Sequence, residues 1–401
     1  MSEGICFAGL DVHARKTAAA AVQLGSGEVF KAQLPGSPRA VIEWLVGLPG
    51  PVRAVYEAGP TGFGLARQAR AEGVEVMVCS PGAIPRQPGD KIKTDTRDAL
   101  KLARLHAAGQ LRPVLVPSLE LEALRDLVRA REDLRGDLMA ARHRIGKLLL
   151  RRGLIFPGPG DPWASQRHLA WLGSIRLDDR LAQIVLGEYL ACHEVLLARR
   201  DRLDALIGEQ AQTERWVGVV GRLRCMRGID TLTAVGLLAE IGDFSAFSHP
   251  RQLTSFVGLV PSERSSGDKR RQGSITKAGS SHARRLLIEA AWHYRRRPAV
   301  SLTLRRRQDG QPPAAIQAAW RAQLRLSKRW AHLDARRAKR RTTVAVAVAR
   351  ELTCFCLGDR PPTRLTNPSS PRLGWGWRPA RATRDPRLRY EHQPERWRAR
   401  Y

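Results

Sequence analysis

The chain has 401 residues, enough for two or three domains, and its 43% hydrophobic content is sufficient for real cores. Its formal net charge of +30 points to a polyanion partner, most simply nucleic acid. We expect a cytoplasmic protein with reduced thiols, because the six cysteines lack zinc-ligand spacing, the start of the chain lacks a secretion signal, and no segment reaches the roughly 18 apolar residues of a membrane span.

Short apolar runs alternate with turns over the first part of the chain, and three of them in succession predict an antiparallel meander. The predicted strands cover residues 5–11, 17–24, 28–34, 51–56 and 74–79. The predicted helices cover residues 38–48, 63–72 and about 95–108. A meander followed by alternating strand and helix is the element order of an RNase H-like fold, so we expect an α/β domain of this class at the N-terminus.

Four acids stand where such a sheet would hold a metal centre. Asp11 ends the first strand, Glu57 follows the fourth, and Asp95 and Asp98 lie three positions apart, on one face at the start of a helix. Two Mg²⁺ ions about 3.5–4 Å apart need hard oxygen ligands of this kind to act on a phosphodiester. Acids at a helix N-terminus are also ordinary caps, which is the alternative for the last two.

Long charged helical patterns follow over residues 118–150 and 180–215, separated by a Pro- and Gly-rich break, and they predict an antiparallel helical arm. A plain helical subdomain and a dimerising coiled coil both fit this pattern. Residues 226–242 resemble a helix-hairpin-helix, in which the turn at Gly228 would present backbone N–H groups to a DNA phosphate. A structural turn between two helices is the alternative.

Residues 258–279 form a Gly- and Ser-rich stretch, predicted as a loop, in which Ser266 and Gly267 allow close backbone approach. Cations that could surround a phosphate crowd this loop: Arg264, Lys269, Arg270, Arg271 and Lys277. A serine in this setting could attack phosphorus and form a covalent link. A non-catalytic phosphate-binding loop remains the alternative from the residues alone.

The rest of the chain is predicted to be mainly helical, over residues 280–297, 314–333 and 336–357. His293 is interpreted as a packing residue or a phosphate contact. After Gly358 the chain is rich in Arg, Pro and Gly, cannot bury enough apolar area to order itself, and is predicted to be a disordered basic tail. The predicted divisions are residues 1–117, 118–215, 216–357 and 358–401.

Several motifs together resemble the insertion-sequence transposases of the one-ten group, which pair a RuvC-like DEDD domain with a C-terminal transposase domain and which include pilin-gene invertases. The resemblance covers roughly residues 5 to 357. The motifs that carry it are Gly9–His13, Tyr56–Gly62, Lys93–Ala99, Gly258–Gly279 and Ala283–Tyr294.

The resemblance implies a mechanism that the spacing of residues does not show. It implies that Asp11, Glu57, Asp95 and Asp98 hold Mg²⁺ and that Ser266 is the nucleophile, with the adjacent Ser265 as the alternative. It also implies excision and insertion of an element through a circular form, with a structured guide RNA pairing to both element-end and target DNA. Family complexes are oligomeric, so we expect a dimer or tetramer in which the acids of one subunit face the serine of another.

Other functions remain in competition with an RNA-guided DNA transposase. A metal-dependent nuclease for branched DNA, or an invertase without a guide RNA, would need the acids but not the guide, and the nuclease would not need Ser266. An actin-like sugar kinase also opens with Gly-x-Asp near a meander, but the sequence shows no second phosphate loop. A non-catalytic RNA-binding protein would need only the basic residues.

Overall fold

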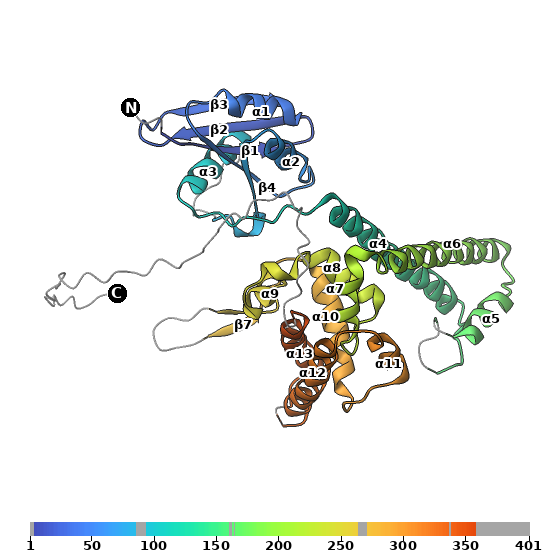
Figure 1. Ribbon diagram of the computed structural model, residues 1–401. Coiled ribbons are helices and arrows are strands. Elements are labelled where there is room, and N and C mark those ends of the chain that lie inside the picture. Colours follow the sequence, from blue (N-terminus) through green and yellow to red (C-terminus); the bar gives the residue numbers. More distant parts are fainter. Residues whose placement is uncertain are drawn as a thin grey trace, which may run out of the picture.

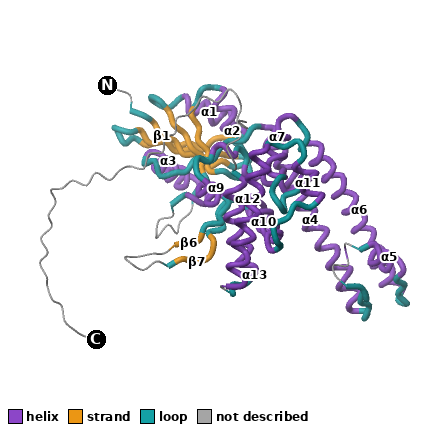
Figure 2. The backbone as a smooth tube through the Cα atoms, turned by 60° about the horizontal axis from the view of Figure 1, so that its bottom comes forward, coloured by secondary structure: helices purple, strands orange, loops and turns teal. Residues whose placement is uncertain are grey.

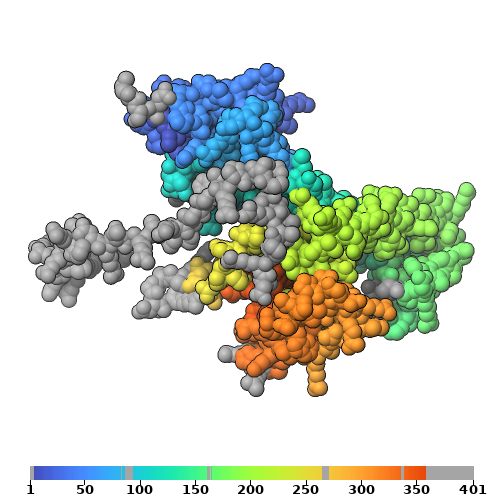
Figure 3. Space-filling view, in the orientation of Figure 1, coloured from blue at the N-terminus to red at the C-terminus, as the bar shows by residue number. Residues whose placement is uncertain are grey.

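The computed structural model describes residues 4–85, 94–159, 163, 165–263, 271–336 and 338–357. A sheet with flanking helices, a long two-helix arm and a mainly helical bundle follow one another along the chain (Figure 1). The same three parts are distinct in the space-filling view, in blue, green and yellow to orange (Figure 3). The predicted basic tail, residues 358–401, lies outside the described residues.

The N-terminal part holds a mixed five-stranded sheet with the order β3-β2-β1-β4-β5. Its strands are β1 Cys6–Val12, β2 Lys16–Gln23, β3 Val29–Pro35, β4 Val52–Glu57 and β5 Glu75–Cys79. The first three pair antiparallel, and β4 and β5 run parallel to β1. The predicted meander and the mixed α/β character of this part are therefore confirmed.

Helices cover both faces of this sheet: α1 Pro38–Val46, α2 Gly64–Ala71 and α3 Asp95–Ala107. The side chains of α1 and α2 share a core with alternate residues of β1, such as Leu10, and with Tyr56 of β4. Leu102 of α3 packs instead with Val55, which points to the opposite face of β4. A short helical turn, η1 (Pro81–Ala83), follows β5.

Gly9 allows α3 to lie directly on β1. A Cβ atom at Gly9 would stand 2.0 Å from the carbonyl oxygen of Ala99 and 2.5 Å from the backbone nitrogen of Ala103. Because these contacts involve backbone atoms, they cannot be relieved by rotation of a side chain. The absence of a side chain at Gly9 therefore sets where the start of α3 stands relative to the end of β1.

We expect Gly9→Ala to displace α3 and to lower the free energy of unfolding by about 1–3 kcal/mol, the usual cost of overpacking. Urea unfolding measures this loss. Gly64→Ala is the matched control, because a Cβ at Gly64 meets no atom within 4 Å. Equal stability of the two variants would show that α3 does not need this close approach.

The arm consists of α4 (Leu119–Arg151) and α6 (Arg180–Gln210), joined through α5 (Gln166–Ser174). The two long helices run side by side in both backbone views, with α5 at the far end (Figures 1 and 2). Their direction is antiparallel, because Nε of Arg131 lies 2.7 Å from Oδ1 of Asp204 and Nε of Arg142 lies 3.3 Å from Nε2 of His193.

Among the described residues, one helix, α6, is long and apolar enough to span a membrane, by length and composition alone. Its mean hydropathy is 1.4 over its best window. The expectation that no segment could span a membrane concerned an unbroken apolar run, which this helix does not contain, because polar residues such as Glu188 and Glu194 interrupt it. Only 22% of that window is buried in the structure, so Leu181 and Val195 are among the apolar side chains exposed along the arm.

The C-terminal bundle is built from the remaining elements. Its longer helices are α7 Glu214–Arg224, α8 Thr231–Ile241, α10 Ser281–Ala291, α12 Pro313–Ala331 and α13 Arg341–Cys356. Its shorter elements are η3 Phe244–Ala246, α9 Pro250–Phe256, β6 Pro261–Glu263, β7 Gln272–Ile275, η4 Trp292–Arg295, α11 Leu302–Gln308 and the π-helical η5 His332–Arg336. The bundle core also includes Leu121, Leu124 and Val128 of α4, so the first turns of the arm belong to it.

Two expectations for this part need correction. The helix predicted over residues 280–297 ends at Ala291 and continues as the tighter turn η4. The stretch predicted as a loop contains two short antiparallel strands, β6 and β7. Tertiary packing decides both points, since neither segment has a periodic apolar pattern long enough to fix its structure.

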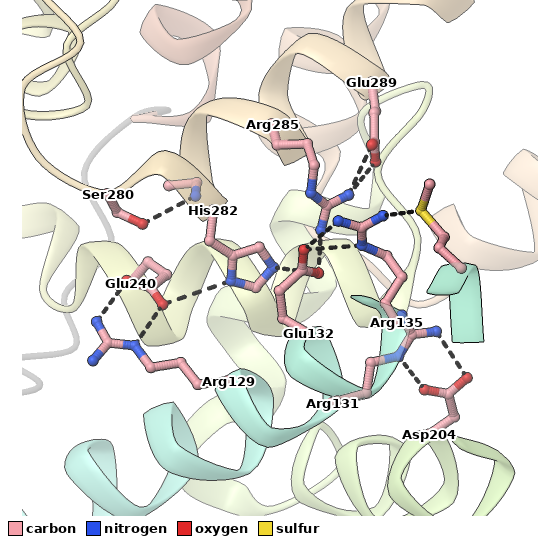
Figure 4. A network of polar contacts seen from close by, with 12 residues as sticks. Arg129, Arg131, Glu132, Arg135, Asp204, Glu240, Ser280, His282, Arg285 and Glu289 are labelled. Carbon is pink, nitrogen blue, oxygen red and sulfur yellow. Dashed lines mark hydrogen bonds and ion pairs between the residues drawn. The ribbon is translucent and has the colours of Figure 1, made fainter. Parts of the chain in front are cut away.

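A polar network joins the arm to the bundle at α4, α8 and α10 (Figure 4). Glu240 of α8 is only 6% exposed, and its two carboxylate oxygens accept from Arg129 of α4 at 3.0 and 3.1 Å. His282 of α10 lies 3.6 Å from both Glu240 and Glu132, and Arg285 binds Glu132 as well. Burial alone would raise the pKa of Glu240, but His282 and Arg129 outweigh it and lower that pKa to about 2.

We expect Glu240→Gln to lower the free energy of unfolding at neutral pH by about 1–3 kcal/mol, because buried donors lose a charged partner. The folded pKa of Glu240 lies below its unfolded value of about 4.3, so its contribution is complete above that value and is lost as the pH falls towards 2. The gap between wild type and variant, measured by urea unfolding, should therefore narrow in acid. A gap that stays constant with pH would contradict this role.

Candidate functional site

The candidate site begins where β1 ends. Asp11 and His13 are two positions apart in an extended segment, so their side chains leave the same face of the sheet. Nε2 of His13 lies 3.3 Å from Oδ2 of Asp11. Asp95, the first residue of α3, joins them, and one ligand atom from each of the three residues lies within 4.8 Å of the others. The close packing of α3 on Gly9 explains how residues so far apart in the chain meet.

Glu57 stands at the end of β4, which is the parallel neighbour of β1. It lines a cleft of about 790 Å³ together with Asp11 and His13. One wall of the cleft is the segment 58–62, where the buried Tyr56 hydroxyl donates to the carbonyl of Gly62 at 3.1 Å. Glu57 thus shares the cleft with Asp11 without belonging to the tight group of three ligand atoms.

Asp98 lies one turn after Asp95 on α3 and is half-buried. Thr94 caps this helix, and its side chain accepts from the backbone N–H of Arg97. The structure therefore brings Asp11 and Asp95 into one group, puts Glu57 in the adjoining cleft, and leaves Asp98 on the same helical face as Asp95.

Two residues of the site were not predicted from the sequence: His13 and Lys16. Nζ of Lys16 lies 2.6 Å from Oδ2 of Asp95, and this hydrogen bond and the lysine charge lower the pKa of Asp95. The alternation of side chains along a strand could have indicated both residues. His13 is two residues after Asp11, and Lys16 is two residues before Ala18, which pairs directly with Asp11.

This donor set fits a divalent cation. Two carboxylates and an imidazole converge there. The ammonium group of Lys16 lies against the carboxylate of Asp95, which shows that this position attracts positive charge. The side chains of Asp11 and Asp95 are 26% and 36% exposed, so a cation can reach them from the solvent. Asp11 and Asp95 would be ligands, and Glu57 in the adjoining cleft and Asp98 one turn along α3 are the acids that could complete the set.

Strands β6 and β7 flank the cationic serine stretch along the chain. Glu263 pairs with Gln272 and Pro261 with Ile275, so the intervening stretch connects two paired strands. Six residues singled out in the sequence lie outside the described residues: Arg264, Ser265, Ser266, Gly267, Lys269 and Arg270. Arg271 is exposed, and Lys277 has φ 57°, a left-handed backbone uncommon for a residue with a side chain.

The base of this hairpin is closely packed. A Cβ at Gly258 would stand 2.3 Å from the carbonyl oxygen of Ala278, and Gly279, at φ 64°, is equally crowded by backbone. Arg284 of α10 donates to the carbonyls of Val257, Ala278 and Gly279, which lie on both sides of the hairpin. The two ends of the hairpin are thus tied to each other and to α10.

Gly228 lies in the turn between α7 and α8, with φ 84°. A Cβ there would stand 2.5 Å from the carbonyl oxygen of Ala290 and 3.0 Å from Cδ2 of His293. Close packing against α10 and η4 is therefore sufficient to require glycine at this position. This agrees with the alternative interpretation of the segment as a structural turn between two helices. The predicted contact of this backbone with phosphate stays a prediction.

Known proteins match both parts that carry candidate residues. Residues 8–153, which include all four acids, match a DEDD transposase domain of the IS110 type, and residues 220–304, which include the serine loop, match the transposase IS116/IS110/IS902 family. The proposed transposase y4qE of Sinorhizobium fredii is 40% identical over 354 residues, 87% of each chain. The transposase for insertion sequence element IS1533 of Leptospira borgpetersenii is 34% identical over 344 residues, 83% of this chain and 98% of that one.

Proposed function

The chain belongs to the IS116/IS110/IS902 family of insertion-sequence transposases, and we propose that it cuts and joins DNA with Mg²⁺, through a phosphoserine link, under the guidance of a structured RNA. It is a DNA-recombining enzyme by family, and its DEDD domain indicates a divalent metal. The observation that carries the proposal is the meeting of Asp11 and Asp95 beside Glu57, from three elements distant in sequence.

The sheet supports an RNase H-like, RuvC-type fold for the N-terminal part. Three antiparallel strands precede two that run parallel to β1, and acids stand at the ends of β1 and β4 and at the start of the helix that covers them. We propose that Asp11, Glu57, Asp95 and Asp98 hold Mg²⁺, which would neutralise charge on the attacking and leaving oxygens of a phosphodiester.

Ser266 is the proposed nucleophile. Its Oγ would bond to phosphorus as the bond to a deoxyribose oxygen breaks, so that the cut strand keeps a phosphoserine link and releases a hydroxyl, which takes the proton. The basic side chains of the loop, among them Arg271 and Lys277, would stabilise the extra negative charge on the phosphate. The paired strands and the tied base of the hairpin would present this loop to DNA.

Guidance by RNA and oligomeric assembly are further parts of the proposal. A net charge of +30 suits a protein that holds RNA as well as element-end and target DNA. The acids and the serine hairpin stand on separate parts of the fold (Figure 1), which suits a dimer or tetramer in which two chains complete one site. The cytoplasm, where DNA and Mg²⁺ meet in bacteria, is the proposed location.

The test is a strand-cleavage assay with a DNA fragment that carries the element end. We expect cleavage that requires Mg²⁺, stops with a chelator, and requires the RNA transcribed beside the gene. A metal-dependent nuclease or an invertase without a guide is the alternative, favoured by the meeting of Asp11, His13 and Asp95 without any residue of the serine loop. Cleavage that is independent of RNA would decide for that alternative.

A further inference from the structure

Several arginines of the arm and the bundle form ion pairs with neighbouring carboxylates. Arg131 pairs with Asp204, Arg285 with Glu132 and Glu289, and Arg325 with Glu351. These pairs neutralise the guanidinium charges within the protein. Other arginines of these parts, such as Arg144 and Arg321, form no ion pair among the described residues, so it is the gathering of several unpaired arginines in one partly buried place that marks a candidate site.

Such a group surrounds the turn between α7 and α8. Nη1 of Arg227, in the turn, donates to the carbonyl of Arg297 at 2.7 Å. Nη1 of Arg307, at the end of α11, donates to the carbonyl of Ile229 in the same turn at 2.5 Å. His293 of η4 packs on Gly228 from a third side. Helix α11 packs against α7, so these segments form one continuous surface of the bundle.

The positive charges of this group are offset only in part, by the charge of Asp230. Within the described part of the chain, no carboxylate pairs with Arg224, Arg227, Arg296 or Arg307. The Nε atoms of Arg224 and Arg307 are buried without a hydrogen-bond partner. Asp230 is the acid that faces the group, and its Oδ1 already accepts from the backbone N–H of Thr233 at the start of α8.

The electrostatics agree with this geometry. Burial, and then the charges of Arg227, Arg296 and Arg307, lower the pKa of His293. Burial and the charge of Arg296 also lower the pKa of Arg227, partly offset by Tyr294. Cations that repel one another in a partly buried place gain stability when an anion joins them. Guanidinium groups bind phosphate through paired N–H donors, which suits this anion best.

We propose that Arg224, Arg227, Arg296 and Arg307 bind the phosphodiester backbone of a nucleic acid, at a surface separate from the acids of the sheet. The proposed ligand is a polymer rather than a single phosphate, because exposed arginines at 295, 297, 305 and 306 adjoin Arg296 and Arg307 in the chain and add positive charge nearby. In Figure 1 this surface lies around α11, in the bundle, away from the sheet. The proposal rests on the proposed function only in taking the polymer to be DNA or RNA.

The test measures binding in a chelator, without cleavage, by fluorescence anisotropy of a labelled DNA duplex and a labelled RNA of equal length over a range of salt concentrations. We expect Arg296→Gln combined with Arg307→Gln to weaken binding and to reduce the slope of log affinity against log salt by about 1 to 2. The polymer whose salt dependence becomes less steep in the variant, DNA or RNA, is the ligand.

Arg325→Gln is the control, because Arg325 is exposed but paired with Glu351 at 2.8 Å. Its slope should equal that of wild type. Arg296→Gln alone covers the case in which the Arg307 variant does not fold, because the side chain of Arg296 forms no hydrogen bond or ion pair in the described residues. It should reduce the slope by about 1.

Unchanged slopes for both polymers in folded Arg296→Gln would overturn the proposal, as would a wild-type protein that binds neither polymer. If Arg296→Gln reduces the slope but the wild-type protein never cleaves DNA, binding of nucleic acid at this surface is supported and only the proposed cleavage chemistry is contradicted. Failure of cleavage and failure of this surface are therefore distinguishable.

Discussion

Asp11→Asn should abolish strand cleavage while the affinity of the protein for duplex DNA stays at its wild-type value. Asparagine keeps the size of the side chain but removes the charge at the centre of the group formed with His13 and Asp95. A site that loses a charged ligand loses stabilisation of the transition state, and we expect the cleavage rate to fall about a thousandfold or more. Duplex affinity depends on basic side chains elsewhere and is independent of this carboxylate.

The measurement is single-turnover cleavage of element-end DNA with Mg²⁺, together with anisotropy on the same duplex. Asp201→Asn is the isosteric control, because Asp201 is exposed on the arm and pairs only with its neighbour Arg200 among the described residues. It should cleave at the wild-type rate. Cleavage by Asp11→Asn within a few-fold of that rate would exclude Asp11 from the chemistry.

Ser266→Ala should remove the covalent protein–DNA adduct. The methyl side chain has no oxygen to bond to phosphorus, so we expect adduct formation to fall by about 10⁴-fold or more, as for the loss of other enzyme nucleophiles. The adduct is measured by denaturing gel electrophoresis of labelled DNA after reaction with Mg²⁺. Ser265→Ala should keep the adduct.

The outcomes separate three mechanisms. An adduct that persists in Ser266→Ala and disappears in Ser265→Ala would move the nucleophile by one residue. Full cleavage by Ser266→Ala without any adduct, in wild type or variant, would favour a nuclease that uses only the acids. An adduct that requires both Ser266 and Asp11 would show that the N-terminal and C-terminal parts of the fold take part in the same reaction.

The sheet was predictable from sequence because its signals are local and agree with one another. Apolar runs of strand length, turns at Gly25 and Gly27, and an acid at the end of two runs all follow from patterns of a few residues. The close approach of α3 to β1 was not predictable, because Gly9 shows its role only when the helix lies on it. His13 and Lys16 were missed although strand alternation puts both beside Asp11.

The bundle was less predictable because long-range contacts decide its structure. The strands β6 and β7 are short, and neither has an apolar alternation that marks a strand. The surface around Arg227 gathers residues from α7, η4 and α11 that are up to 83 positions apart, such as Arg224 and Arg307. A run of arginines in sequence does not reveal which of them lack an acid. The polar network at Glu240 was hidden for the same reason.

Binding of a divalent metal is the decisive property, because carboxylates from separate elements must share one cation if the proposed site exists. Mn²⁺, observed by electron paramagnetic resonance, can stand in for Mg²⁺ in a titration of the full chain. We expect a signal of bound Mn²⁺ in wild type that is lost or strongly weakened in Asp11→Asn and in Asp95→Asn alike. Undiminished Mn²⁺ binding by both folded variants would rule out a shared site at these carboxylates.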